Sequence, residues 1–264
     1  MRFLKWLPGT DETKPAISSA LWENVERQLP FLATLGDSDR TRLRELAVRF
    51  LTGKEWTGAA GLVLTAEIQL SISLQACLLI LNLGLDRYEG LAGIVVYPGD
   101  FLIPRQLMDD DGIVHEFVDA VLGEAWEGGP VLLSWTTDQD VPADGINVVI
   151  HEFAHVLDMA DGSADGTPAL HDGMSRQKWI SDMQAAYDDF CRRDSPDRNE
   201  NRNATIDPYA AENPAEFFAV CSETFFQAPL ALQQAYPAVY VQLMTYYRQD
   251  PSAASQCQDK PPDS

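Results

Sequence analysis

The segment of residues 145–160 constrains this chain more than any other part of the sequence. Its apolar residues recur at helical spacing, and it carries the pattern His-Glu-Phe-Ala-His at residues 151–155. On an α-helix, positions four apart lie one turn apart on the same face, so the imidazoles of His151 and His155 can reach one metal ion. Glu152 stands beside them, within reach of a water molecule on that ion. The pattern predicts a largely buried helix that binds a metal.

A pair of histidines packed in a hydrophobic core is the alternative explanation of this pattern. Imidazoles are costly to bury unless they bind a cation or form hydrogen bonds. The chain has only four histidines in all, so this spacing with a glutamate beside the first histidine rarely arises by accident. The metal-binding interpretation is therefore the stronger of the two.

A catalytic zinc ion takes three protein ligands and a water molecule, so a third ligand must come from elsewhere in the chain. Asp161 nearly fits the metzincin spacing, but Asp158 stands where that pattern needs the glycine that turns the chain back. Glu216, on a predicted second helix, fits the arrangement of glutamate zincins. A capping box that begins at Asn213 would also explain Glu216 without any metal. The residues favour Glu216 and leave the alternatives open.

The charge balance of the chain is strongly acidic. Nineteen basic residues face 40 acidic ones, which gives a net charge of −21. Such a surface repels phosphate backbones and anionic lipids, so we expect no direct nucleic-acid partner and no membrane partner. The acidity is compatible with a basic protein partner, and it also serves solubility alone.

Neither the N-terminus nor the cysteines indicate export. Residues 1–8 contain too short an apolar run for a signal peptide, and polar residues within 68–85 favour a core helix over a membrane span. The four cysteines have no CxxC spacing, which predicts free thiols and a cytoplasmic location. The same spacing disfavours a structural zinc site, because such sites usually close with four ligands.

Hydrophobic patterns predict helices before and after a small sheet. Helical periodicity marks residues 16–28, 38–51, 65–84, 177–193 and 213–248. Asp37 or Ser38 is expected to cap the second of these helices, and Gly84 to end the third. Short β-rich runs mark residues 93–97, 131–135 and, more weakly, 113–121. This order predicts an α+β arrangement in one continuous unit.

Three segments also carry a resemblance to a known family. The run IDPYAAENPAEFFAVCSETFF at residues 206–226 resembles the downstream segment of the Mlc titration factor A family. The members of that family are bacterial zinc peptidases of the glutamate-zincin group. The resemblance extends to GINVVIHEFAHVLD at residues 145–158 and to GPVLLSW at residues 129–135. It covers most of the chain from about residue 40 to residue 251.

The resemblance implies a zincin-like metallopeptidase fold with a small mixed sheet, an active-site helix and additional N- and C-terminal helices. On this basis, residues 1–85 form a helical portion packed on the catalytic unit, and residues 86–250 form the zincin-like catalytic portion. We expect residues 251–264 to be a disordered tail.

The resemblance also implies a set of site residues. It places one Zn²⁺ per chain on His151, His155 and Glu216, which decides for Glu216 and against Asp161. It places Tyr209, seven residues before Glu216, near the metal. No departure from the family pattern occurs at these positions.

A mechanism follows from these assignments. We expect Glu152 to act as the general base toward the attacking water and to return the proton to the leaving amine. The Tyr209 hydroxyl would stabilise the oxyanion, or else the ring packs as an ordinary aromatic residue. Asp158 would accept the free N–H of His155, or else it is solvated near the helix end. Residues 123–126 are the candidate edge strand for pairing with an extended substrate.

Two functions from different classes follow from the sequence. The first is a zinc metallopeptidase that hydrolyses short peptides, with the aminopeptidase-like activity that the family implies. The second is a binding protein, because the family takes its name from sequestering Mlc, a transcriptional repressor. An acidic surface can capture a basic DNA-binding protein by charge complementarity and without catalysis.

Overall fold

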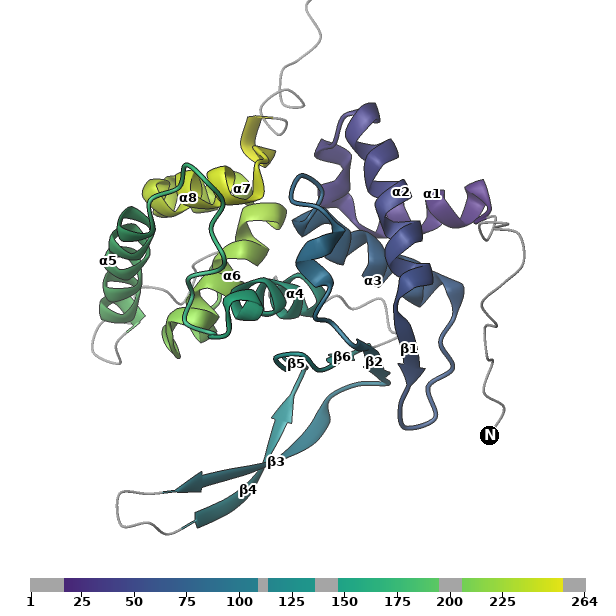
Figure 1. Ribbon diagram of the computed structural model, residues 1–264, viewed down its shortest axis with the longest axis horizontal. Coiled ribbons are helices and arrows are strands. Elements are labelled where there is room, and N and C mark those ends of the chain that lie inside the picture. Colours follow the sequence, from purple (N-terminus) through teal and green to yellow (C-terminus); the bar gives the residue numbers. More distant parts are fainter. Residues whose placement is uncertain (1–16, 109–113, 136–146, 195–205, 254–264) are drawn as a thin grey trace, which may run out of the picture.

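The computed structural model describes residues 17–108, 114–135, 147–194 and 206–253 (Figure 1). The N-terminal part of these residues is helical and consists of α1 (Ser19–Gln28), η1 (Pro30–Thr34), α2 (Asp37–Gly53) and α3 (Ala66–Leu79). Thr65 caps α3, because its hydroxyl accepts the Ile68 N–H at 3.2 Å. α3 is buried from Ile68 onward on nearly all sides, as its apolar composition predicts.

A small mixed sheet lies at the centre of the described chain. Its strands, in spatial order, are β1 (Glu55–Gly58), β2 (Gly93–Tyr97), β6 (Val131–Ser134) and β5 (Gly123–Ala125). β1, β2 and β6 run parallel, whereas β5 is antiparallel to β6 and forms an edge of the sheet. The strands predicted at residues 93–97 and 131–135 are confirmed, and the predicted edge segment at residues 123–126 forms β5.

Two further strands form a separate hairpin that projects from the rest of the molecule (Figure 1). They are β3 (Phe101–Met108) and β4 (Val114–Val121), paired antiparallel. β4 corresponds to the weak β-rich run predicted at residues 113–121. β1 and β3 were not predicted. β1 depends on pairing with β2, which is distant in the sequence, and β3 depends on pairing with β4.

The C-terminal half is again helical. It contains α4 (Val148–Asp158), η3 (Met159–Asp161), α5 (Arg176–Asp194), η4 (Pro208–Ala211), α6 (Pro214–Gln227), α7 (Pro229–Ala235) and α8 (Pro237–Tyr247). α4 packs against β5 and β6 and contacts α3 and α6 (Figure 1). The helices predicted at residues 145–160, 177–193 and 213–248 are confirmed within the described residues. The fold class is α+β, as predicted.

One hydrophobic core joins the N-terminal helices to the C-terminal half. Phe50 of α2, Tyr88 of η2 (Leu85–Tyr88) and Phe153 of α4 meet edge to face, with ring centroids 5.2 to 5.8 Å apart. All three side chains are fully buried. The face of α4 opposite the histidines is therefore fixed by contacts from the first half of the chain. The division of the chain at residue 85 stays a prediction.

Two helix boundaries differ from the predicted ones. α2 has Gly36 as its N-cap, and Asp37 is its first residue, where a carboxylate is favoured by the helix dipole. α3 ends at Leu79, before the predicted stop at Gly84. The N–H groups of Leu83 and Gly84 instead donate to the Ile80 carbonyl oxygen, and Gly84 adopts φ +100° at the end of that turn.

Part of the predicted C-terminal tail is described and is helical. Residues 251–253 form a helical turn, in which the Ser252 N–H donates to the Tyr240 hydroxyl at 3.1 Å. Residues 254–264 lie outside the described residues, as do residues 1–8 and the start of the helix predicted at residue 145. None of the described helices is long and apolar enough to cross a membrane.

Candidate metal centre

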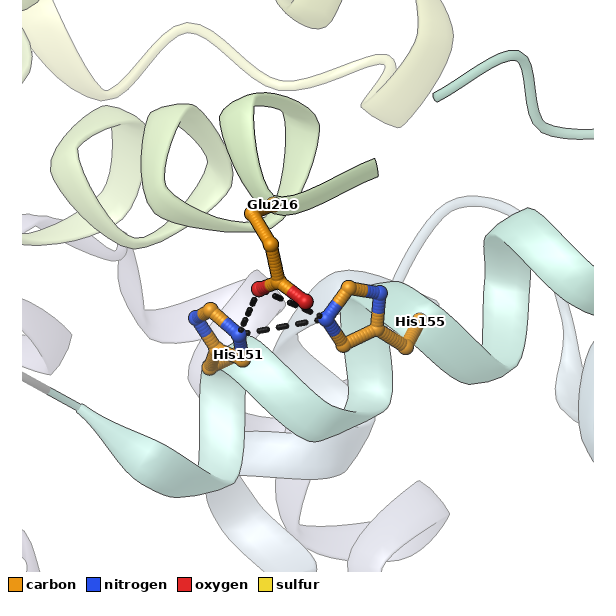
Figure 2. Close-up of side chains that lie close together, drawn as sticks. All are labelled: His151, His155 and Glu216. Carbon is orange, nitrogen blue, oxygen red and sulfur yellow. Dashed lines mark hydrogen bonds and ion pairs between the residues drawn. The ribbon is translucent and has the colours of Figure 1, made fainter. Parts of the chain in front are cut away.

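α4 presents its two histidines on the face that turns away from the hydrophobic core. Asn147 caps the helix, since its side-chain oxygen accepts the Ile150 N–H at 3.0 Å. Ile150 and Phe153 are fully buried in the core, whereas His151 and His155 point toward α6 (Figure 2). The predicted helical pattern is thus realised with both imidazoles one turn apart on one face.

Three ligand-type atoms from two helices converge on one point (Figure 2). His151 Nε2 lies 2.9 Å from Glu216 Oε2, and His155 Nε2 lies 3.2 Å from the same oxygen. The two Nε2 atoms are 3.1 Å apart. Glu216, from the first turn of α6, thus reaches across to both histidines of α4.

This arrangement fits a divalent metal. Tetrahedral ligands at the usual zinc distances of about 2.0–2.1 Å stand about 3.3 Å from one another, close to the observed separations. Two imidazole nitrogens and one carboxylate oxygen are a common donor set in catalytic zinc sites. Glu216 and the two histidines are also largely shielded from solvent, with side chains 11% to 16% exposed. The cluster is therefore compatible with a bound metal ion.

Without a metal ion, the cluster favours a positively charged His151 and a negatively charged Glu216. Burial raises the pKa of Glu216, but hydrogen bonds from His151 and His155 outweigh it and lower that pKa to about 2. Burial lowers the pKa of His151, but its hydrogen bonds to Glu216 and Glu223 raise it to about 10. The carboxylates thus favour a positive charge at this point, which a metal cation supplies.

The structure places the two candidates for the third ligand, Asp161 and Glu216, differently. The Asn213 side chain caps α6 and accepts the N–H groups of Ala215 and Glu216 at 2.9 and 3.0 Å. The Glu216 carboxylate meanwhile points at the histidines. Asp161 lies outside the cluster and pairs with Arg176 at 3.5 Å. The structure brings Glu216 to the histidines and leaves Asp161 apart.

A second glutamate of α6, which the sequence reasoning did not single out, contacts His151 from the other side. Glu223 Oε1 lies 2.7 Å from His151 Nδ1, and Glu223 Oε2 accepts the Asn147 N–H at 2.5 Å. A carboxylate that accepts from Nδ1 keeps a ring proton there and leaves Nε2 as the nitrogen that would bind a metal ion. The sequence signal for Glu223 is its spacing from Glu216, because residues 216 and 223 lie two turns apart on one helix face.

Glu152 lies in the same cavity as the metal-type cluster. This cavity has a volume of about 810 Å³ and is lined by β5, α4, η4 and the first turns of α6. Glu152 is only 5% exposed, and burial raises its pKa to about 8. Its carboxyl group therefore holds a proton more tightly than that of an exposed glutamate.

Tyr209 stands at the mouth of this cavity. It is the second residue of η4, and Asp207 accepts its N–H at 2.7 Å. Its ring centroid is 6.0 Å from that of His151, and 54% of the residue is exposed. The predicted proximity of Tyr209 to the histidines is thus present, and the exposure disfavours an ordinary packing role.

Asp158 does not form the predicted hydrogen bond with His155. Its Oδ2 accepts the Gly166 N–H at 2.8 Å, and no hydrogen bond joins it to His155 in the described part of the chain. Asp158 is fully buried, so it is not solvated either. Gly166 packs against the first turn of α6, where a Cβ at residue 166 would lie 2.5 Å from the Pro214 carbonyl oxygen. Asp158 therefore anchors the loop that abuts the helix of Glu216.

A helix that carries His-Glu-x-x-His, with a glutamate from a second helix beside the two histidines, has the donor arrangement of the metallopeptidase class. Comparison with known proteins agrees: the chain belongs to the family described as glucose-regulated metallo-peptidase M90, whose model matches residues 5–248. It is 37% identical over 254 residues to proteins named Mlc titration factor A from Yersinia pestis (strain Pestoides F) and Yersinia pseudotuberculosis (serotype O:1b, strain IP 31758). Each alignment covers 95% of this chain and 92% of the relative. The resemblance stated from the sequence is confirmed.

Proposed function

We propose that this chain is a zinc-dependent peptidase of the zincin type, with its metal held by His151, His155 and Glu216. The observation that carries the proposal is the convergence of these three side chains in one cavity with Glu152. Within this proposal, residues 86–250 form the catalytic portion, and residues 1–85 form a helical portion packed on it.

Zinc is the metal that the donor set favours. Three protein ligands of the nitrogen and carboxylate type are typical of catalytic zinc sites, whereas structural sites usually close with four. When bound, zinc lowers the pKa of its water from about 15.7 to about 7 and so supplies a nucleophile at neutral pH. Of the described residues, only His151, His155 and Glu216 form a cluster of this kind.

Glu152 is proposed as the general base. It follows His151 directly on α4 and lines the cavity beside the histidines. Burial raises its pKa, which makes the ionised carboxylate a stronger base than an exposed glutamate, able to take a proton from the attacking water and deliver it to the leaving amine. Tyr209, which lines the same cavity, is proposed to stabilise the charge that develops on the carbonyl oxygen of the scissile bond.

The cavity supports an aminopeptidase-like action on short peptides. Its described lining contains carboxylates from five elements or loops but no lysine and no arginine. Such a lining attracts a positively charged α-amino group. β5 forms both an edge of the sheet and one wall of the cavity, so an extended peptide can pair with it. The substrate is therefore proposed to be a short peptide with a free N-terminus.

Glu152→Gln tests the proposed mechanism directly. The substitution removes the base and keeps the size of the side chain and all three metal ligands. We expect hydrolysis of an alanine chromogenic amide by the zinc-loaded protein to fall by at least about 100-fold, as general-base catalysis typically contributes. Zinc content should stay the same. Undiminished cleavage by this variant would mean that Glu152 is not the base.

A second candidate function is capture of a transcriptional repressor. The relatives are named Mlc titration factor A, and the net charge of −21 suits a basic DNA-binding partner. This function requires no catalysis, so Glu152→Gln should leave repressor binding intact while it abolishes hydrolysis. Capture of a repressor would require a cytoplasmic location, which we propose, and the free thiols of Cys77, Cys191 and Cys221 are compatible with a reducing compartment.

A further inference from the structure

Gly123, the first residue of β5, lies directly against the Glu152 side chain. A Cβ atom placed at residue 123 would lie 2.5 Å from Glu152 Cγ and 2.7 Å from Cδ, and closer still to Oε1. Separations below 3.0 Å are essentially never found for real Cβ atoms. The Glu152 carboxyl group therefore occupies the space that any side chain at residue 123 would need.

Residue 123 must be a glycine because no room is left for a side chain, and not because of its backbone conformation. Gly123 does not adopt the left-handed φ that excludes other residues, in contrast to Gly128 and Gly162 nearby. A residue with a side chain would adopt the β-strand conformation of Gly123 without strain. The contact with Glu152 is thus the feature that distinguishes this position.

The backbone is held in place on both sides of the contact. β5 is held by its pairing with β6, in which Gly123 lies opposite the fully buried Leu133, and the Ser134 N–H donates to the Leu122 carbonyl oxygen at 2.7 Å. Glu152 is 5% exposed on a helix whose other face is fixed in the core by Phe153. A clash at residue 123 would therefore be relieved mainly by rotation of the Glu152 side chain.

We propose that Gly123 is a positioning residue for the general base, because its missing side chain lets the β5 backbone cover the Glu152 carboxyl group and hold it beside the histidines. The catalytic part of this inference rests on the proposed function. β5 is also the edge strand to which the substrate is proposed to pair. In this proposal, β5 positions both the Glu152 carboxyl group and the substrate peptide.

The steric part is tested by a stability cycle that needs no catalysis. Gly123→Ala should lower the Tm of the protein that carries Glu152 and should have little effect in a Glu152→Ala background, where the space is empty. Gly90→Ala is the matched control, since no atom lies within 4 Å of its added Cβ and its φ is not left-handed. If Gly123→Ala lowers the Tm equally in both backgrounds, or fails to fold in both, the contact with Glu152 is not the cause and the inference is wrong.

The positioning part is tested on the zinc-loaded protein. Gly123→Ala should lower kcat by about 100-fold, the effect of a misplacement of about 1 Å, while zinc affinity stays within about twofold because no ligand is touched. Unchanged kcat in a variant that shows the steric coupling would overturn the positioning role. If the unsubstituted zinc-loaded protein cleaves no peptide, the proposed function fails, and the stability cycle still decides the steric claim.

Discussion

The backbone and the side chain of Glu216 have different partners. Its backbone N–H donates to the Asn213 side chain and completes the cap of α6, whereas its carboxylate meets His151 and His155. From the sequence, the cap and the metal ligand were alternatives, because the glutamate of a capping box turns back toward the cap residue. The structure shows that the two are compatible, and this makes the side chain available to a cation.

Glu216→Gln tests the ligand assignment. The variant keeps the length of the side chain and the backbone cap but loses the negative charge, so we expect zinc affinity to fall by at least about 100-fold. Glu212→Gln is the control, since Glu212 is exposed and does not line the cavity. Competition with a chelator of known affinity measures both variants. Equal affinities would show that Glu216 is not a ligand.

Asp158 predicts a pH dependence of stability. Burial raises its pKa to about 7 despite the hydrogen bond from Gly166. The folded protein therefore holds this proton more tightly than the unfolded chain, whose Asp pKa is about 3.9. This contribution stabilises the fold at low pH and is lost as pH rises between about 4 and 7.

Asp158→Asn should remove that contribution, because an amide resembles the protonated acid and still accepts the Gly166 N–H. The unsubstituted protein should lose up to about 1.4 kcal/mol of stability per pH unit, relative to the variant, over this window. Denaturant unfolding of both zinc-free proteins at several pH values measures the difference. Parallel pH profiles would contradict the prediction.

At the scale of elements, α4 and α6 together build the whole metal-type cluster. α6 places Glu216 against the Nε2 side of His151 and Glu223 against its Nδ1 side. Glu223 also binds the Asn147 N–H at the start of α4, so the same carboxylate fixes the helix end and the imidazole ring. The separation of the two glutamates by seven residues makes this double contact possible.

Glu223→Gln should therefore weaken metal binding although Glu223 is not a ligand. An amide has only one acceptor oxygen, so either His151 or Asn147 loses its partner. We expect zinc affinity to fall by about 10- to 100-fold, the usual effect of removing a partner behind a metal ligand. The measurement is again chelator competition, with Glu212→Gln as the control. A variant that binds zinc as tightly as the unsubstituted protein would show that the Glu223 contact is unimportant.

Elements with strong local patterns were predictable, and those that depend on distant contacts were not. α4, α5 and α6 follow from periodicity and caps, and β2 and β6 from short β-rich runs. β1 has only four residues and is defined by its pairing with β2, from which it is separated by α3. Gly123 was missed as a site residue for the same reason, because its importance lies in its contact with Glu152 across elements. The spacing of Glu223 from Glu216 is a local signal, but its contact with His151 also lies across elements and is visible only in the structure.

At the scale of the whole molecule, one core and one acidic surface set the context of the site. The contacts of Phe50 and Tyr88 with Phe153 tie the N-terminal helices to the helix of the histidines. Family, fold class and the convergence of two histidines and a glutamate agree with the sequence interpretation. The net charge of −21 leaves both a peptide substrate and a basic protein partner compatible with the surface.

The most direct test is the zinc content of the purified protein by elemental analysis, paired with hydrolysis of an alanine chromogenic amide before and after chelation. We predict about one zinc ion per chain, as expected for a single site with three protein ligands, and cleavage that chelation abolishes and added zinc restores. A protein that binds no zinc even after supplementation would contradict the account and leave His151 and His155 as histidines hydrogen-bonded to buried glutamates.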